Sequence, residues 1–321
     1  MSFPLKIGTR ESELAVWQAT LVQNELAAHG IPSELIYIKS DGDIDLVTPL
    51  YELGVQGIFT KTLDAALLSK RIDIAVHSMK DVPTQLAKGI VQAAVLKRAS
   101  HKDILVVNRQ SAIVNTLSVT KNEFNNSPFT THDSRYIIAT SSIRRKAQWL
   151  HRYPNTTIEN LRGNVNTRLR KVYESNWHGA IFAAAGLERI NLRPENSIEL
   201  DWMLPAPAQG AITVVCREDE TDTFEKCNLL NDEATALCTK AERDFLRTLM
   251  GGCSTPISAL AELDNDELIF KGNIFSLDGM KHVSVEKNYS LQDADTAGIS
   301  AGNEVLNNGG KEIVEEIKNA K

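Results

Sequence analysis

Apolar and polar residues alternate in short blocks over the first 100 positions, a pattern typical of strands and helices that follow one another. Apolar runs with strand character cover 4–9, 33–39 and 72–77, and helical periodicity covers 11–30 and 58–70. In the first helix we expect Leu14, Trp17, Leu21 and Leu26 to share the buried face. This order predicts βαβ units and a largely parallel sheet.

The same alternation returns after residue 102. Strands are expected at 103–107, 136–140 and 179–185, and helices at 142–153 and 164–175. Residues 6–18 resemble 137–149, and residues 72–81 resemble 179–189. This faint internal similarity predicts two related lobes with an anion-binding cleft between them, although the general pattern of βαβ units explains it equally well.

The pattern changes near residue 222, where one long helical block, 231–250, precedes short alternating strands and two C-terminal helices. We therefore expect an α/β protein of two lobes with a smaller α+β domain behind them. The first lobe is assigned to 1–100 and 205–220, the second to 101–204, and the third domain to 221–321. The polar segment 109–134 is expected to be a long surface loop or insertion.

The composition argues against several kinds of partner for this protein. The net charge of −6 argues against a nucleic-acid partner, which normally requires a basic excess. No apolar run reaches the length of a membrane span, and the N-terminus lacks a secretory signal, so we expect a cytoplasmic protein without a membrane partner. Without a secretory signal the four cysteines are expected to be reduced thiols, and because no pair has CxxC spacing a metal site is not expected.

Arginines occur repeatedly where helices are expected to begin. A helix N-terminus carries partial positive charge, so a cation there is unfavourable unless an anion binds nearby. Any one of these arginines could equally be solvated or paired with a local acid. Together they favour a cleft for a ligand with several carboxylates, since no phosphate-binding glycine loop is present. The arginines concerned are Arg10, Arg144, Arg145, Arg162 and Arg168, with hydroxyl groups at Ser12, Ser141 and Ser142.

One acid and one thiol are placed unusually. Asp81 follows the apolar strand at 72–77, beside Ser78 and Lys80, where strand ends open into a ligand crevice. There it could exchange a proton with a substrate and stabilise a developing cation, or simply cap a turn. Cys253 lies directly after Gly251 and Gly252, a backbone setting that a core cysteine does not need.

Seven motifs in this order closely resemble the porphobilinogen deaminase family, from residue 5 to about 290: IGTRESELAVWQA, DIAVHSMKDVP, ATSSIRRKAQ, LRGNVNTRL, AAAGLERI, PAPAQGA and GGCSTPI. The resemblance implies two lobes like those of periplasmic binding proteins, a third domain, and a transferase of tetrapyrrole and haem biosynthesis. Such an enzyme joins four porphobilinogen molecules head to tail, releases ammonia and forms linear hydroxymethylbilane.

The resemblance also implies roles for individual residues. Cys253 would carry a dipyrromethane cofactor through a thioether, and Asp81 would be the catalytic acid. The cofactor and substrate carboxylates would be bound by Arg10, Ser12, Gln18, Phe59, Ser78, Lys80, Ser142, Arg144, Arg145, Arg162, Gly163, Asn164, Arg168 and Arg189. The remaining cysteines, Cys216, Cys227 and Cys238, would pack in cores, and a monomer is expected.

The sequence departs from the family at Gln56, where a lysine is usual, which would remove one carboxylate contact. Two other classes of function stay open. A two-lobed anion-binding protein without chemistry would explain the arginines but not Asp81 or the thiol. A cysteine hydrolase would need a histidine base, for which His77 is the candidate, and Cys253 does not stand at a helix start that would lower its pKa.

Overall fold

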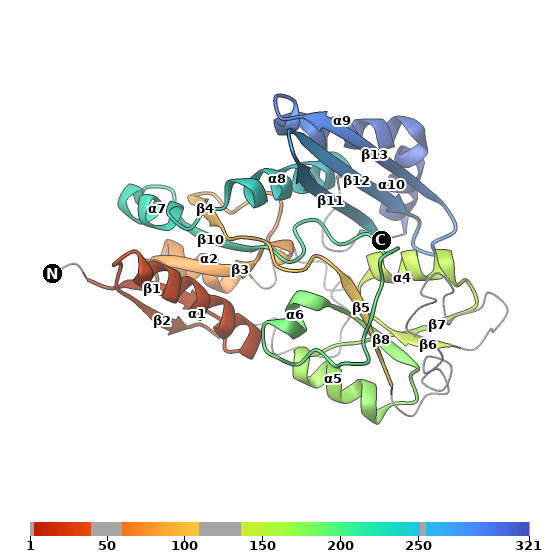
Figure 1. Ribbon diagram of the computed structural model, residues 1–321, viewed down its shortest axis with the longest axis horizontal. Coiled ribbons are helices and arrows are strands. Elements are labelled where there is room, and N and C mark those ends of the chain that lie inside the picture. The colour runs from red at the N-terminus through yellow and green to blue at the C-terminus, as the bar shows by residue number, and fades with distance from the viewer. Residues whose placement is uncertain (1–2, 40–59, 109–135, 251–254, 321) are drawn as a thin grey trace.

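The computed structural model describes residues 3–39, 60–108, 136–250 and 255–320. These residues form three sheets, each with its own helices (Figure 1). In Figure 1 the first lobe lies at the left, the second at the lower right, and the third domain at the top. The predicted class, two α/β lobes and a smaller α+β unit, is confirmed.

The first lobe is a five-stranded sheet in the order β2-β1-β3-β10-β4. Its strands are β1 (Leu5–Thr9), β2 (Ser33–Tyr37), β3 (Ile74–Ser78), β4 (Ile90–Val95) and β10 (Ile212–Arg217). Its helices are α1 (Glu13–Ala28), α2 (Lys61–Leu68), the 3-10 turn η2 (Met79–Asp81) and α7 (Thr221–Asn228). Helix α7 packs on this sheet, because Cys227 joins the same apolar cluster as Ile7 and Val214. The proposed boundary at 221 therefore moves, and α7 belongs with the first lobe.

The second lobe repeats this arrangement in the order β7-β6-β8-β5-β9. Its strands are β5 (Asp103–Val107), β6 (Ile137–Ala139), β7 (Thr157–Glu159), β8 (Gly179–Ala183) and β9 (Ile198–Glu199). Its helices are α4 (Ile143–Arg152), α5 (Val165–Glu174) and α6 (Ala184–Glu188), so the strand expected over 179–185 ends two residues early.

The two sheets share one topology. In each, three parallel strands are followed by an antiparallel strand, β10 in the first lobe and β5 in the second. The similar segments of the sequence, β1–α1 with β6–α4 and β3 with β8, hold equivalent places in this order. The expectation of a largely parallel sheet is therefore wrong for β5 and β10. Each of these two strands directly follows a segment that crosses from one lobe to the other. It therefore enters its sheet from the end that faces the other lobe.

The third domain packs α8 (Glu233–Thr248), α9 (Ala297–Val305) and α10 (Lys311–Asn319) on one antiparallel sheet. Its strands are β11 (Ile257–Asp264), β12 (Glu267–Phe275) and β13 (His282–Ser290), and two short turns are η3 (Ala294–Thr296) and η4 (Leu306–Gly310). Phe245 and Phe270 lie fully buried in its core, with ring centroids 5.3 Å apart.

Helix α1 buries Leu26 and packs Leu21 against the same core, as predicted, but Trp17 does not belong to the buried face. Ala15, Ala19, Val22 and Leu26 are buried, whereas the Trp17 residue is 36% exposed. The indole of Trp17 instead faces Arg189 of the second lobe, whose guanidinium carbon lies 5.7 Å from the ring centroid. A large aromatic residue at the cleft was thus mistaken for a core residue.

Glu242 of α8 joins all three units. Its side chain is fully buried and accepts hydrogen bonds from Arg98 Nη1 at 2.6 Å and Arg98 Nη2 at 3.1 Å. It also accepts from the backbone N–H groups of Ala208 at 2.6 Å and Ala261 at 2.8 Å. Because Arg98 and Ala208 lie on the two segments that cross between the lobes, one carboxylate fixes both crossings to the third domain.

Cys216, Cys227 and Cys238 are buried free thiols, as predicted. Burial raises their pKa values to about 11, about 12 and about 11, respectively, so these thiols stay protonated at neutral pH.

No helix within the described ranges is long and apolar enough to cross a membrane.

Candidate functional site

Asp81 ends the short turn η2, which follows β3 directly. Val82 then adopts an extended conformation (φ −86°, ψ 130°), as expected for a residue before proline. Pro83 thus stops the turn from continuing as a helix, and the Asp81 side chain stays half-buried at the end of the strand. This is the edge of the sheet at which α/β proteins bind ligands.

A chain of polar contacts leads from this turn to the second lobe. The Nζ of Lys80 donates to Oε1 of Gln209 at 3.4 Å, and Nε2 of Gln209 donates to Oδ1 of Asp103 at 2.9 Å. Gln209 lies on the segment that returns from the second lobe, and Asp103 is the first residue of β5. The sites expected separately in the two lobes are therefore physically connected.

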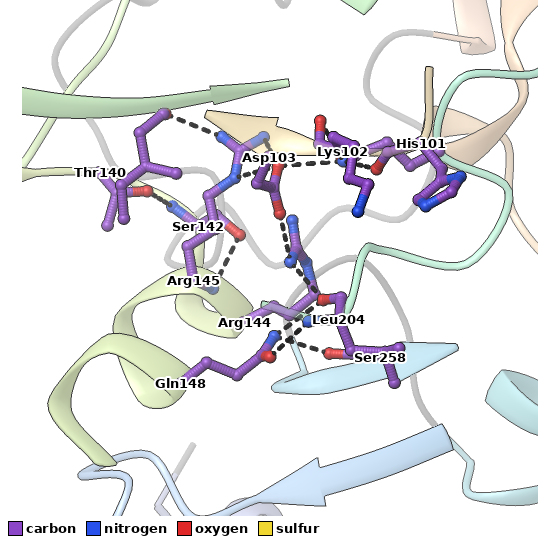
Figure 2. A network of polar contacts seen from close by, with 12 residues as sticks. His101, Lys102, Asp103, Thr140, Ser142, Arg144, Arg145, Gln148, Leu204 and Ser258 are labelled. Carbon is purple, nitrogen blue, oxygen red and sulfur yellow. Dashed lines mark hydrogen bonds and ion pairs between the residues drawn. The ribbon is translucent and has the colours of Figure 1, made fainter. Parts of the chain in front are cut away.

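Asp103 is the centre of the arginine site, as Figure 2 shows. The Nη1 of Arg144 lies 2.7 Å from Oδ2 of Asp103, and Arg145 donates to Oδ1 from Nε at 3.1 Å and from Nη2 at 2.8 Å. Asp103 is fully buried, and the two arginines are 5% and 8% exposed. Burial alone would raise the pKa of Asp103, yet attraction by Arg144 and Arg145 and hydrogen bonds from Arg144 and Gln209 hold it well below its usual range.

Asp103 thus provides negative charge that partly offsets the two arginines at the start of α4. Arg145 also donates from Nη1 to the carbonyl of Ile181 at 3.1 Å, so each of its three nitrogens contacts a protein oxygen. Arg144 donates to the carbonyl of Leu204 at 2.8 Å, while its Nε is buried without a hydrogen-bond partner among the described residues. The three bonds of Arg145 use three of its five N–H donors, so they fix the guanidinium and leave two donors for a ligand.

Arg168 is the clearest cation without an anionic contact. Its Nε is buried and has no hydrogen-bond partner in the described part of the chain. Burial, followed by repulsion from Arg145 and Arg162, lowers the pKa of Arg168 to about 10, and attraction by Asp81 partly opposes this shift. Asp81 of the first lobe is thus close enough to Arg168 of the second to attract it electrostatically.

Three of the predicted binding residues build the starts of helices. Ser142 is the N-cap of α4 and accepts from the backbone N–H of Arg145 at 3.4 Å, and Asn164 is the N-cap of α5 and accepts from Thr167 at 2.9 Å. Gly163 has φ +115°, and a Cβ there would lie 2.8 Å from Cγ2 of Thr167. These contacts explain the residue types through local structure, and ligand contacts remain a prediction.

Other predicted residues make contacts within the first lobe or with the crossing segment. Gln18 is 3% exposed and donates to Oγ of Ser78 at 2.8 Å, which ties α1 to β3. Ser12 is the N-cap residue of α1 but makes no side-chain capping bond, and Arg10 follows β1. Arg189 donates to the carbonyl of Gly210 at 2.6 Å.

The predicted cofactor residue, Cys253, and Phe59 lie outside the described residues, as do Gln56 and the 109–134 segment. The strand that follows residues 251–254 is nevertheless well placed. Oγ of Ser258 accepts from Nε2 of Gln148 at 2.9 Å, and Gln148 lies one helical turn after Arg144 (Figure 2). Strand β11, which follows residues 251–254 in the sequence, therefore lies next to α4, the helix that carries Arg144 and Arg145.

His77 has no suitable setting for a catalytic base. It is buried and lines a small pocket within the first lobe, together with Thr60, Asp64 and Val215. Burial, followed by repulsion from Arg10, lowers the pKa of His77 to about 4. The ring is therefore neutral and only weakly basic at neutral pH, which argues against the hydrolase alternative.

Sequence reasoning missed Asp103 and Gln209, which organise the site. A signal was present at Asp103, since an acid opens an otherwise apolar strand that is buried throughout. Gln209 carried no comparable signal, because its role follows from the crossing of the chain between the lobes.

The first prediction concerns Asp103. In a Cys253→Ser background, which leaves the cleft without a tethered group, Asp103→Asn should lower the midpoint of thermal unfolding by several degrees. Removing one partner of a buried ion pair typically costs about 3–5 kcal/mol. The control is Asp201→Asn, whose 74% exposed carboxylate pairs with neighbouring Lys102 and should contribute little. Equal midpoints for the two variants would contradict the role of Asp103.

The second prediction concerns Lys80. Burial lowers its pKa from 10.5 to about 8, with Asp81 and Asp103 raising it and Arg144 and Arg145 lowering it. Between these two pH values the unfolded chain binds more protons at this residue, so stability contributed by Lys80 should rise with pH across that window. In the Cys253→Ser chain with ¹³C-labelled lysine, a resonance absent from Lys80→Met should titrate near pH 8. A midpoint near 10.5 would show that the amine is not desolvated.

Solved structures with similar architecture include ligand-binding proteins of bacteria. The VFT2 domain of Bordetella pertussis BvgS is 13% identical, with a TM-score of 0.38 over 70% of this chain and 84% of that one. The methionine-binding protein MetQ is 13% identical, with a TM-score of 0.41 over 70% and 89%. A ligand-binding component of an ABC-type import system from Staphylococcus aureus is 13% identical, with a TM-score of 0.37 over 76% and 73%. Similarity at this level adds nothing to the fold described above.

Two family models match the sequence and together span most of it. Residues 5–225 match the model described as porphobilinogen deaminase, dipyrromethane cofactor binding domain. Residues 236–307 match the model described as porphobilinogen deaminase, C-terminal domain. The matched regions contain the acid, the arginine site and the predicted cofactor cysteine, and the chain belongs to the porphobilinogen deaminase family.

Proposed function

We propose that this chain joins four porphobilinogen molecules head to tail, with release of ammonia, on a dipyrromethane primer carried by Cys253. The observation that carries the proposal is the chain of contacts through Lys80, Gln209 and Asp103, which links the turn of Asp81 to the arginines of the second lobe. Every pyrrole ring of the substrate bears an acetate and a propionate. A cleft rich in guanidinium groups suits such carboxylates, since each can bind through two parallel hydrogen bonds.

The family is that of a dipyrromethane-binding enzyme of tetrapyrrole synthesis, and the residues described here fit such a group. Two buried guanidinium nitrogens, Nε of Arg144 and Nε of Arg168, lack hydrogen-bond partners among the described residues. Buried donors of this kind are costly when left unpaired, and carboxylates on the cofactor or substrate would satisfy them. Arg144, Arg168 and Lys80 are the residues that we assign to these carboxylates.

When bound, dipyrromethane supplies a pyrrole ring whose free α-carbon can act as a nucleophile. The chain's own contribution is electrostatic and positional. As porphobilinogen loses ammonia, the bonding pair of the C–N bond leaves with nitrogen, and positive charge develops on the ring. The Asp81 carboxylate would stabilise that charge and could accept the proton released when the new C–C bond forms.

The thiol assignment has its own support. The three described cysteines are buried and protonated, so none is available for attachment. Cys253 lies between α8 and β11, and Ser258 at the start of β11 is hydrogen bonded to the arginine helix through Gln148. The first strand after this segment thus contacts the helix that carries Arg144 and Arg145, which supports the assignment.

A binding protein without chemistry remains the alternative from another class of function. It would use the arginine cleft but would leave Asp81 opposite Arg168 and the thiol without a role. A cytoplasmic location and a monomeric state also remain predictions from the sequence.

The third prediction separates these alternatives. The purified protein should weigh more than its sequence by two porphobilinogen units less the ammonia lost, with the excess on the peptide containing Cys253. The Asp81→Asn variant should keep this excess mass and its thermal midpoint while losing at least about 100-fold in kcat, because charge stabilisation at the reacting ring is removed.

Intact-mass spectrometry and the rate of porphobilinogen consumption measure the two quantities, with Asp222→Asn, a surface change, as the control. An unmodified Cys253 would favour the binding protein. A turnover of Asp81→Asn within a few-fold of the parent would remove Asp81 from the mechanism.

A further inference from the structure

Arg243 of α8 forms three hydrogen bonds to the backbone around Asp81. Its Nη1 donates to the carbonyl of Val82 at 2.9 Å and to that of Met79 at 3.3 Å. Its Nη2 donates to the carbonyl of Pro83 at 2.6 Å. One guanidinium from the third domain thus binds the first lobe on both sides of the acid.

These carbonyls need partners because the regular structure ends there. Strand β3 stops at Ser78 and η2 contains a single turn, so the backbone from Met79 to Pro83 has few regular hydrogen bonds. The planar guanidinium offers several donors in a fixed fork, which a lysine cannot reproduce. The identity of the residue, and not only its charge, therefore suits the task.

The position of Arg243 is itself fixed. The preceding residue is Glu242, which holds α8 against Arg98, Ala208 and Ala261 through the four hydrogen bonds described above. Arg243 consequently extends from a rigid part of the helix toward the turn.

Packing behind the turn is incomplete. Met79 and Thr84 line a cavity of about 330 Å³, and Lys240 and Arg243 line the same cavity from α8. Met79 shares an apolar cluster with Ala236 of α8, and the hydrogen bonds from Arg243 supply the polar part of the contact between α8 and the turn.

We propose that Arg243 is a positioning residue that sets the location of Asp81 relative to the bound substrate. The proposal rests on the function proposed above. Helix α8, which carries Glu242 and Arg243, would then join the crossing segments and the turn of the acid. A displacement of about 1 Å at a catalytic group can cost roughly 100-fold in rate.

The test compares Arg243→Met with Arg247→Met in the holoenzyme. Arg247 lies one turn further along α8, is 56% exposed and pairs with Asp244, so it is a matched control. We expect Arg243→Met to lower kcat about tenfold or more, with KM for porphobilinogen within about twofold and the cofactor mass retained. Arg243→Lys should be intermediate because it keeps fewer of the three bonds, and Arg247→Met should match the parent.

A double-mutant cycle shows whether the effect runs through the acid. In an Asp81→Asn background, Arg243→Met should lower kcat by less than twofold, because there is no longer a carboxylate to position. An equal loss in both backgrounds would mean that Arg243 stabilises the fold in general, and the proposal would be wrong.

Hydrogen exchange gives a readout that does not depend on turnover. The peptide covering residues 78–85 should exchange faster in Arg243→Met than in Arg247→Met. If the parent consumed no porphobilinogen, the proposed function would fail while this comparison still showed whether Arg243 orders the turn. Unchanged exchange, or a kcat equal to that of Arg247→Met in an active parent, would overturn the inference.

Discussion

Repulsion between guanidinium groups is the constraint on which this structure depends. Arg144, Arg145 and Arg168 approach one another in a largely buried space, where like charges interact far more strongly than in water. The completely buried carboxylate of Asp103 offsets the charges of Arg144 and Arg145. Two arginines face one carboxylate, so positive charge remains there in a chain whose net charge is −6, and we propose that it binds carboxylates.

The fold brings these charges together because the two lobes repeat one sheet topology and are joined by two crossing segments of the chain. Strand ends of both lobes point at the cleft, and the two crossing segments supply Arg98 and Gln209 at its base. Glu242 then fixes both crossings to α8. Lys80, Asp103 and α8 are thereby joined through Arg98 and Gln209 in one polar network that extends through all three units.

Much of the fold could be predicted from local pattern, because most helices and strands carry their own periodicity. The arginines and Asp81 could also be found, since a cation at a helix start and an acid after a strand are locally unusual. Asp103, Gln209 and Arg243 act through partners 42, 106 and 160–164 residues away, which no local pattern reveals. Trp17 was misplaced for the same reason, because its contact lies in the other lobe.

The central claim is that this cleft recognises its ligand through the ligand's carboxylates. Calorimetric titration of the Asp81→Asn holoenzyme with porphobilinogen, and separately with its dimethyl ester, tests this directly. The account predicts that the free acid binds with an affinity that falls as salt rises, and that the ester binds at least about 100-fold more weakly. Equal binding of acid and ester would contradict it.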